Sequence, residues 1–357
     1  MAFTAEGGVE PKGERYDRSY LVKSNDKLYK RTEYNDFIYS SNNLDVGSIG
    51  LNKYGTAVIS DVYEIFSVLP DNLPTFVSEL IQRPHNMAEI LKYRQGCLYG
   101  QYRIYAEDFL SVSVFAPKKC EQEKISHFLD VLDNKIAYQR SLVEALKKYK
   151  RGVMQRIFRN MPIVSPSGFE TVHLSDIFKK VSRRNSNGDI KNVITNSAEY
   201  GLIPQRDFFD KDIAVDGNTA NYYVIEHGDF VYNPRKSNSA PYGPFNRYER
   251  EEKGIISPLY TCLVLQTDIE PSYLAWYFKS DAWYRYIYDN GSQGVRHDRV
   301  SMTDDLLMGI PVIIPAKEAQ LKIAKLLDCL ESRFQTELSQ YESLKSIRVA
   351  LLQQLFI

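Results

Sequence analysis

The side chains of this sequence that could catalyse a reaction or bind a metal are scattered along the chain. The five histidines show no spacing typical of metal ligands, and isolated histidines are more often structural. They are His85, His127, His173, His227 and His297. The four cysteines form no Cys-x-x-Cys pair, so the sequence predicts neither a zinc site nor a disulfide framework, and it fits a reducing cytoplasm.

Two features could still suggest an enzyme. Asn233-Pro234 is similar to the start of the Asn-Pro-Pro-aromatic loop of amino methyltransferases, but two basic residues follow it here. No glycine-rich loop after a strand provides a site for S-adenosylmethionine. Asp36 and Asp229 could suggest a nuclease, yet each precedes an apolar run and fits a turn. We predict a chain without catalytic residues, with a stand-alone methyltransferase or nuclease as the alternative.

Residues that can bind DNA occur in two polar loops, Asn233–Ser239 and Gly291–Asp298. The candidates are Arg235, Lys236, Ser237 and Asn238 in the first loop, and Gln293 and Arg296 in the second. Arginine can bind guanine through two hydrogen bonds, asparagine can bind adenine, and lysine or serine can bind phosphate. An ordinary solvated turn is the alternative for each loop.

Further candidates lie elsewhere in the sequence. Arg94 and Gln95 open a loop that aligns with Gly291–Asp298, and Arg183 and Arg184 are either phosphate contacts or merely exposed. A basic stripe follows Glu144 with no further acidic residue before position 160. It comprises Lys147, Lys148, Lys150, Arg151, Arg156 and Arg159. The stripe could face a DNA backbone, bind an acidic protein surface or be solvated.

The elements that carry these residues are repeated. Lys119–Ile125 aligns with Lys317–Ile323 at an offset of 198 residues, and Phe158 aligns with Phe356 at the same offset. Such a long period excludes a solenoid. Upstream the match weakens and its offset drifts, so the framework is shared while the loops differ. One unit is used twice, which suggests a partner with two related faces.

Both copies of the aligned segment predict a long helix. Apolar residues recur at alternating spacings of three and four over about five heptads, a pattern typical of a coiled coil. The residues predicted for helix pairing and partner docking are Ile125, Leu129, Leu132, Ile136 and Leu146 in the first helix and Ile323, Leu327, Leu330, Phe334 and Leu344 in the second. Polar residues interrupt both seams at equivalent points, and an antiparallel pairing would bring Lys150 near Glu337. Two independent amphipathic helices are the alternative.

A globular segment of mixed pattern precedes each helix. Short apolar alternations predict strands, among them Val112–Phe115 and Ile310–Ile314, and helical patterns occur at Leu73–Leu91 and Pro271–Tyr288. The predicted fold class is therefore α+β, with two domains that are each followed by a long helix and two helices that pair as a coiled coil. No apolar run approaches the roughly 20 residues of a membrane helix, and the 26 tyrosines suit recognition surfaces.

This layout resembles the specificity subunit of type I restriction-modification systems over most of the chain. The most specific motif is a Glu-Gln-Xaa-Lys-Ile core, present as Glu121–Ile125 and less completely within Pro315–Ile323. Leu327-Asp328 and the Leu-Leu-Gln-Gln-Leu ending of Lys345–Leu355 extend the match. The domains expected from the resemblance are 1–117 and 161–315 for target recognition, with 118–160 and 316–357 as helical regions.

The resemblance implies a function without catalysis. In that family each recognition domain reads one half of a split DNA sequence. The two long helices pair there as an antiparallel coiled coil and set the distance between the halves, so the resemblance implies antiparallel pairing here. The implied partners are double-stranded DNA, two methyltransferase subunits that dock on the helices, and restriction/translocase subunits. S-adenosylmethionine, ATP and Mg belong to those partners and no cofactor to this chain. A coiled-coil scaffold without a DNA role is a further alternative.

One departure from the family concerns the first domain. Gly168–Phe178 opens the second domain as the family's first strand and helix do, but the first domain has no counterpart of it. About thirty residues are expected there from the repeat. The resemblance therefore leaves open whether the shortened first domain reads its half-site.

Overall fold

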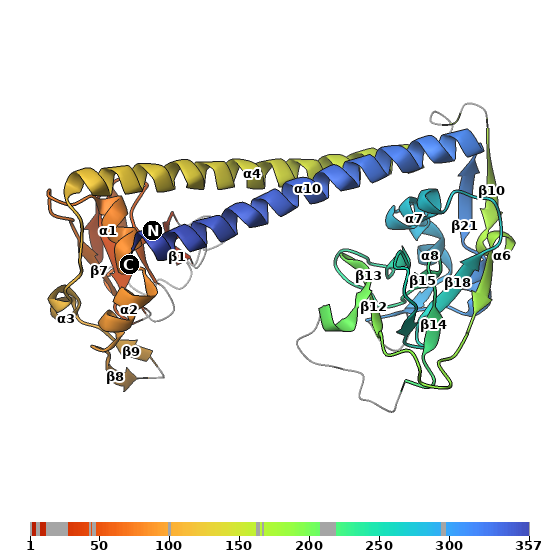
Figure 1. Ribbon diagram of the computed structural model, residues 1–357, viewed down its shortest axis with the longest axis horizontal. Coiled ribbons are helices and arrows are strands. Elements are labelled where there is room, and N and C mark those ends of the chain that lie inside the picture. Colours follow the sequence, from red (N-terminus) through yellow and green to blue (C-terminus); the bar gives the residue numbers. More distant parts are fainter. Residues whose placement is uncertain are drawn as a thin grey trace. The chain divides into compact units, whose positions relative to one another are not determined.

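The computed structural model divides into two compact units joined by two long helices (Figure 1). It describes residues 2–4, 8–11, 28–42, 44, 48–98, 101–161, 165, 168–207, 219–293 and 298–356. Unit 1 comprises residues 1–141 with 339–357, and unit 2 comprises residues 142–338. Each long helix therefore begins in one unit and ends in the other. Within the described part of the chain, no helix combines the length and apolar character that crossing a membrane requires.

Unit 2 is built on a four-stranded antiparallel sheet with the order β11-β18-β15-β16. Its strands are β10 (Phe169–His173), β11 (Phe178–Val181), β12 (Ile194–Ser197), β13 (Gly201–Pro204), β14 (Tyr223–Ile225), β15 (Phe230–Tyr232), β16 (Phe245–Arg247), β17 (Gly254–Ile256), β18 (Thr261–Leu265), β19 (Ser292–Gln293), β20 (Val300–Ser301) and β21 (Pro311–Pro315). Its short helices are α6 (Leu174–Ile177), α7 (Pro271–Lys279), α8 (Tyr284–Asn290) and α9 (Asp304–Met308). Aromatic side chains of the sheet and of α7 fill the core, with the rings of Phe245 and Phe278 stacked at 4.0 Å.

Unit 1 contains a related three-stranded sheet with the order β5-β4-β7. Its strands are β1 (Ala2–Thr4), β2 (Gly8–Glu10), β3 (Tyr29–Thr32), β4 (Phe37–Ser40), β5 (Ile49–Leu51), β6 (Ala57–Ser60), β7 (Tyr63–Phe66), β8 (Gln95–Leu98) and β9 (Gln101–Arg103). Its short helices are α1 (Pro74–Ile81), α2 (Pro84–Leu91) and α3 (Ala106–Ser111). The stacked rings of Tyr39, Phe66 and Phe109 lie in its core.

The two sheets follow the sequence repeat. β5, β4 and β7 occupy the sequence positions of β16, β15 and β18, and the hairpin β1-β2 corresponds to β12-β13. Among the described residues of unit 1, no element takes the place of β10, α6 and β11. Residues 113–117 align with β21 but form no strand, so the strand predicted at Val112–Phe115 is wrong. In unit 2, β21 pairs with β10, and without such a partner Phe115 is 97% exposed.

The long helices α4 (Lys119–Arg159) and α10 (Lys317–Leu355) pair antiparallel, as predicted. Lys150 of α4 bonds to Glu331 of α10 in unit 2, and Arg348 of α10 bonds to Asp133 of α4 in unit 1. Asp133 and Lys150 are 17 residues apart on α4, as are Glu331 and Arg348 on α10, so both ion pairs belong to one register. Lys150 therefore has Glu331, and not the expected Glu337, as its ion-pair partner.

The predicted seam residues lie on the buried side of this helix pair. Leu129, Ile323 and Leu327 are buried, and the other seven are half-buried. The ends of the helices also enter the domain cores. In unit 2, the ring of Phe158 packs against Tyr273 and Tyr277 of α7, while in unit 1 the aligned Phe356 stacks on Phe76 of α1 at 5.2 Å. Equivalent aromatic contacts thus pack the C-terminal end of each long helix against a helix of its domain.

Replacing Lys150 with glutamate should destabilise unit 2, because it places a second carboxylate beside Glu331. The two side chains are 20% and 30% exposed, so we expect a loss of about 1–2 kcal/mol in the free energy of unfolding, less than for a fully buried pair. Urea denaturation of the full chain measures this loss, and adding Glu331→Lys should recover most of it. Lys325→Glu, at an exposed position of α10, is the control.

The same pair predicts a pH dependence. Burial alone would raise the pKa of Glu331, but hydrogen bonds from Gln335 and Lys150 and the nearby positive charge lower it below its usual 4.5. The stability that the pair contributes is therefore present above about pH 4.5 and is lost as the pH falls through the lowered pKa. A Lys150→Met variant should differ from wild type at neutral pH and converge with it in acid. A difference that persists below that pKa would contradict the assignment.

Candidate nucleic-acid interface

The loop Asn233–Ser239 has a backbone fixed by buried polar contacts. The side-chain oxygen of Asn233 accepts a hydrogen bond from the Arg235 N–H (3.0 Å), and its amide donates to the Asn196 carbonyl (3.2 Å). Gly243 lies against this turn with φ +85°, and a Cβ there would be 2.0 Å from the Asn233 carbonyl oxygen. Only glycine fits at that position. The loop is thus held in place before any ligand binds.

The structure brings the two predicted loops of unit 2 together. The Lys236 N–H donates to the Asp298 carbonyl (2.8 Å), and the Val300 N–H donates to the Pro234 carbonyl (2.9 Å). Arg235 also lies 3.7 Å from the Asp298 carboxylate. Residues 234–236 and 298–300 therefore form one short ladder. Arg296 lies outside the described residues, and Gln293 is placed by the backbone pairing of β19 with β20.

The side chains of the loop Asn233–Ser239 differ in solvent exposure and in their intramolecular hydrogen bonds. Arg235 is 68% exposed, Asn238 is exposed, and Lys236 is half-buried. The hydroxyl of Ser237 accepts the Ala240 N–H (3.1 Å) within a turn. Arg235 and Asn238, the two residue types suited to reading bases, are therefore both accessible. Ser237 has a structural role as well.

Other predicted contacts have partners within their own unit. In unit 2, Arg183 bonds to Asp229 and lies 3.5 Å from Glu226. Burial raises the pKa of Asp229, although the Arg183 charge opposes this rise. Arg184 donates to the Asn221 side chain (3.0 Å). Two carboxylates lie close to Arg183, whereas Arg235 has one, at 3.7 Å. Arg183 is therefore less suited than Arg235 to bind a phosphate.

In unit 1, the predicted pair Arg94 and Gln95 lies at the start of the β8-β9 hairpin. Arg94 donates to the Leu91 carbonyl (2.9 Å), and its guanidinium lies 5.2 Å from the Tyr102 ring centre. Gln95 donates to the Asp108 carboxylate (2.8 Å). Both side chains are exposed, and both have intramolecular contacts that binding to DNA would have to replace.

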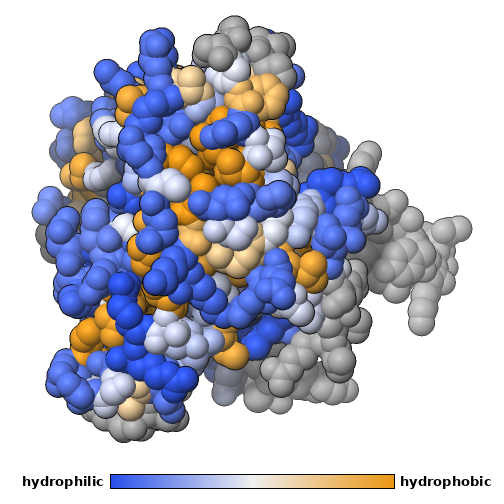
Figure 2. Space-filling model, turned by 90° about the vertical axis from the view of Figure 1, so that its right-hand side faces the viewer, coloured by the Kyte–Doolittle hydropathy of each residue, from blue (hydrophilic) through white to orange (hydrophobic). Residues whose placement is uncertain are grey.

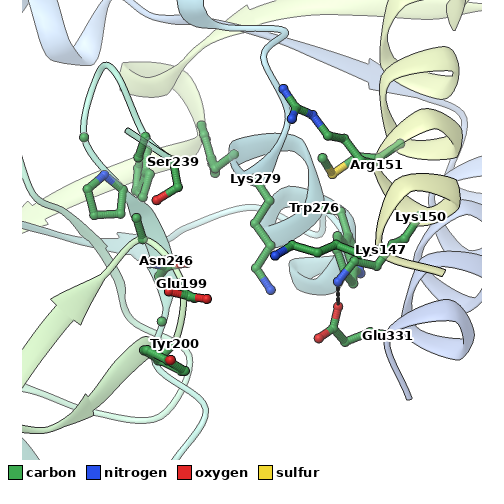
Figure 3. Close-up of a pocket in the computed structure, with 18 of the residues that line it drawn as sticks. Lys147, Lys150, Arg151, Glu199, Tyr200, Ser239, Asn246, Trp276, Lys279 and Glu331 are labelled. Carbon is green, nitrogen blue, oxygen red and sulfur yellow. Dashed lines mark hydrogen bonds and ion pairs between the residues drawn. The ribbon is translucent and has the colours of Figure 1, made fainter. Parts of the chain in front are cut away.

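A cleft of about 1130 Å³ lies between the basic stripe and the strands of unit 2. Figure 3 shows its walls: Lys147, Lys150 and Arg151 come from α4, Lys279 and Trp276 from α7, and Glu331 from α10. The opposite side is formed by Glu199 and Tyr200 of the β12-β13 turn, by Asn246 of β16 and by Ser239, the last residue of the loop Asn233–Ser239. The loop and the cleft are therefore contiguous.

Positive charge dominates this cleft. Five cations line it against three carboxylates: Lys147, Lys148, Lys150, Arg151 and Lys279 against Glu144, Glu199 and Glu331. Of these cations only Lys150 has an ion-pair partner among the described residues. Lys279 lies 4.5 Å from the Trp276 ring centre, and burial lowers its pKa. An anion in the cleft would gain from charges that the protein leaves uncompensated.

Two features of this interface were missed in the sequence. Lys279 and Trp276 belong to an apolar helix pattern, and nothing local marks them as facing the basic stripe. The exposed apolar residues of the long helices were also not predicted to form a binding surface. Phe128 aligns with Leu326, and Tyr149 aligns with Ile347, all at the offset of 198 residues and all exposed. The offset was the available signal, because a matched exposed pair suggests a matched binding surface.

The outer face of unit 2 seen in Figure 2 is mostly hydrophilic, with hydrophobic side chains gathered between the charged ones. Exposed apolar residues of this unit include Phe169, Leu259, Leu321 and Leu326. The seam residues, in contrast, are covered by the helix pairing. The exposed residues of the helices are therefore more accessible to a protein partner than the seam residues, for which docking stays a prediction.

Comparison with solved structures identifies the fold. One similar chain comes from a structure that concerns complex assembly and conformational transition of the type I R-M system. It is 15% identical to this chain with a TM-score of 0.56, and the match covers 94% of this chain and 84% of that one. The S subunit of a type I restriction-modification system from M. genitalium has 16% identity, a TM-score of 0.52 and coverage of 92% and 84%. The HsdS subunit from Thermoanaerobacter tengcongensis has 16% identity, a TM-score of 0.49 and coverage of 94% and 83%.

No family model and no curated protein matches the sequence. The likeness is therefore one of fold, and it confirms the fold class predicted above: α+β domains with two long helices that pack together. The predicted boundaries of the four segments and the predicted DNA contacts stay predictions.

The Lys147→Glu, Lys148→Glu double variant should weaken binding of duplex DNA to the full chain. If each lysine neutralises one phosphate, the slope of log K against log salt should fall by about 0.9 per lysine. Fluorescence anisotropy at several salt concentrations measures the slope. Lys135→Glu, an exposed position on the other half of α4, should leave the slope unchanged. An equal effect of both changes would show that the cleft has no special part in binding.

Proposed function

We propose that this chain is the DNA-sequence specificity subunit of a type I restriction-modification complex and that it reads a split sequence. The observation that supports this most strongly is the repeat as it is folded. Two sheets share one strand framework, whereas the loops that leave them differ in length, sequence and charge. A repeated scaffold with divergent loops suits a protein that reads two different half-sites.

Recognition in unit 2 is assigned to the loop Asn233–Ser239 and to the cleft beside it. Arg235 and Asn238 are exposed on a fixed backbone, which suits hydrogen bonding to base edges in the major groove. The cations of the cleft suit the phosphate backbone that continues from the same site. Base contacts would thus specify the sequence and phosphate contacts would position the duplex.

The paired helices are assigned two roles. Their length and single register would set the distance between the half-sites. Their exposed aligned residues, Phe128 with Leu326 and Tyr149 with Ile347, would bind two copies of one methyltransferase subunit, because two copies need two equivalent surfaces. Restriction subunits would join that assembly. S-adenosylmethionine, ATP and Mg would be bound by the partners, and this chain would take no part in the chemical steps.

Deletion of the gene for this chain should remove one split adenine-methylation motif from the host genome. Long-read sequencing that detects modified bases, performed with and without the gene, measures this. Complementation with the wild-type chain should restore the motif, whereas a chain with Phe128→Asp and Leu326→Asp should not, because its partner surface is charged. Lys325→Glu, an exposed change on the same helix as Leu326, is the matched control and should restore the motif.

An unchanged set of methylated motifs after deletion would contradict the proposed function. A scaffold without a DNA role predicts that outcome, and a stand-alone methyltransferase predicts activity without any second subunit. Expression of the chain alone in a methylation-free host distinguishes the latter, since the proposal predicts no methylation there.

A further inference from the structure

Two aligned glutamines connect the long helices to their domains by the same buried contacts. Gln122 of α4 and Gln320 of α10 are separated by the repeat offset and are only 1% and 4% exposed. In unit 1, the Gln122 side-chain oxygen accepts the Leu73 N–H (2.9 Å), and its amide donates to the Pro117 carbonyl (2.8 Å). A buried amide with all its bonds made is costly to replace.

The contacts of Gln320 in unit 2 repeat this arrangement. Its oxygen accepts the Glu270 N–H (2.9 Å), and its amide donates to the Pro315 carbonyl (2.8 Å). Leu73 and Glu270 are the N-cap residues of α1 and α7, respectively. Each glutamine therefore joins three parts of the chain: the first turn of a long helix, the segment that leads into it, and the start of a domain helix.

A lysine strengthens each of these junctions from outside. Lys119 donates to the Pro70 carbonyl (2.7 Å), and the aligned Lys317 donates to the Asp268 carbonyl (2.9 Å) and carboxylate (2.7 Å). In unit 2, the Asp328 carboxylate of α10 also accepts the Trp276 indole N–H (2.7 Å). Hydrogen bonds with fixed directions resist rotation of a helix on its domain, which apolar packing alone resists less.

We propose that Gln122 and Gln320 are positioning residues that hold each recognition domain at a fixed angle on its helix and thereby make the complex selective for the spacing of the two half-sites. This inference rests on the proposed function. Each glutamine acts through the helix it fastens, since that helix continues into the other unit. Neither residue lies in the loops or the cleft assigned to DNA.

The inference is tested with Gln122→Leu and Gln320→Leu chains in the host deleted for the gene. The probe is a plasmid library in which the methylated motif has its spacer shortened or lengthened by one base pair. Wild type should methylate the natural spacer selectively. Each leucine variant should methylate the altered spacers relatively more, with selectivity reduced by about tenfold, as expected from one lost set of buried hydrogen bonds. Preferences within each half-site should not change.

The controls separate positioning from a loss of folding. Gln353→Leu, an exposed glutamine of α10, should behave as wild type. Lys317→Ala removes only the outer contact, so it should reduce spacer selectivity less than Gln320→Leu does. This variant keeps the test valid if Gln320→Leu lowers the cellular amount of the chain. A variant that loses methylation equally at all spacers, or that keeps wild-type selectivity, overturns the inference. If the wild-type chain directs no split motif at all, the proposed function itself fails.

Discussion

The rest of the structure depends on the antiparallel pairing of α4 and α10. Apolar side chains at alternating spacings of three and four bury one face of each helix, and this burial supplies most of the stabilisation. Apolar seams alone tolerate shifts of register. The pairs Lys150–Glu331 and Asp133–Arg348 do not, because a shift would leave half-buried charges without partners. One register follows, and with it the positions at which the helices meet each domain.

The repeat explains why this arrangement can serve two different tasks. Where the copies agree, they agree in contacts as well as residues: Gln122 with Gln320 at the helix starts, and Phe158 with Phe356 at the helix ends. Where they differ, the differences lie in the loops and in charge. The basic stripe of α4 recurs only in part in α10, where Ser346 aligns with Lys148 and Val349 aligns with Arg151. Lys345 and Arg348 do align with Lys147 and Lys150. Identical contacts maintain the framework, and the loops are not constrained by those contacts.

Much of the fold could be predicted from the sequence because it depends on local periodicity. The seam residues and the two helices followed from spacing and from the repeat, and their antiparallel direction followed from the family resemblance. The register did not, since several acidic residues of α10 could bind Lys150 and only packing selects Glu331. The strand predicted at Val112–Phe115 failed for a related reason: a strand needs a partner, and the partner of the aligned β21 is β10.

The candidate site was predictable only in part. Arg235 and Asn238 were found because their residue types suit base recognition and their loop is polar. The role of Arg183 was not apparent, because its carboxylate partners are distant in sequence. The cleft could not be predicted from the sequence, because Lys279 and Lys147 line one cavity only through tertiary packing.

The most direct test of this account is the motif methylated in a host whose only copy of the gene carries Arg235→Ala. If each domain reads its own half-site and the helices merely hold them, one half of the motif should become degenerate or weakly methylated. The other half and the spacer should stay as in wild type. Equal loss of specificity in both halves would contradict the division of roles between loops and helices.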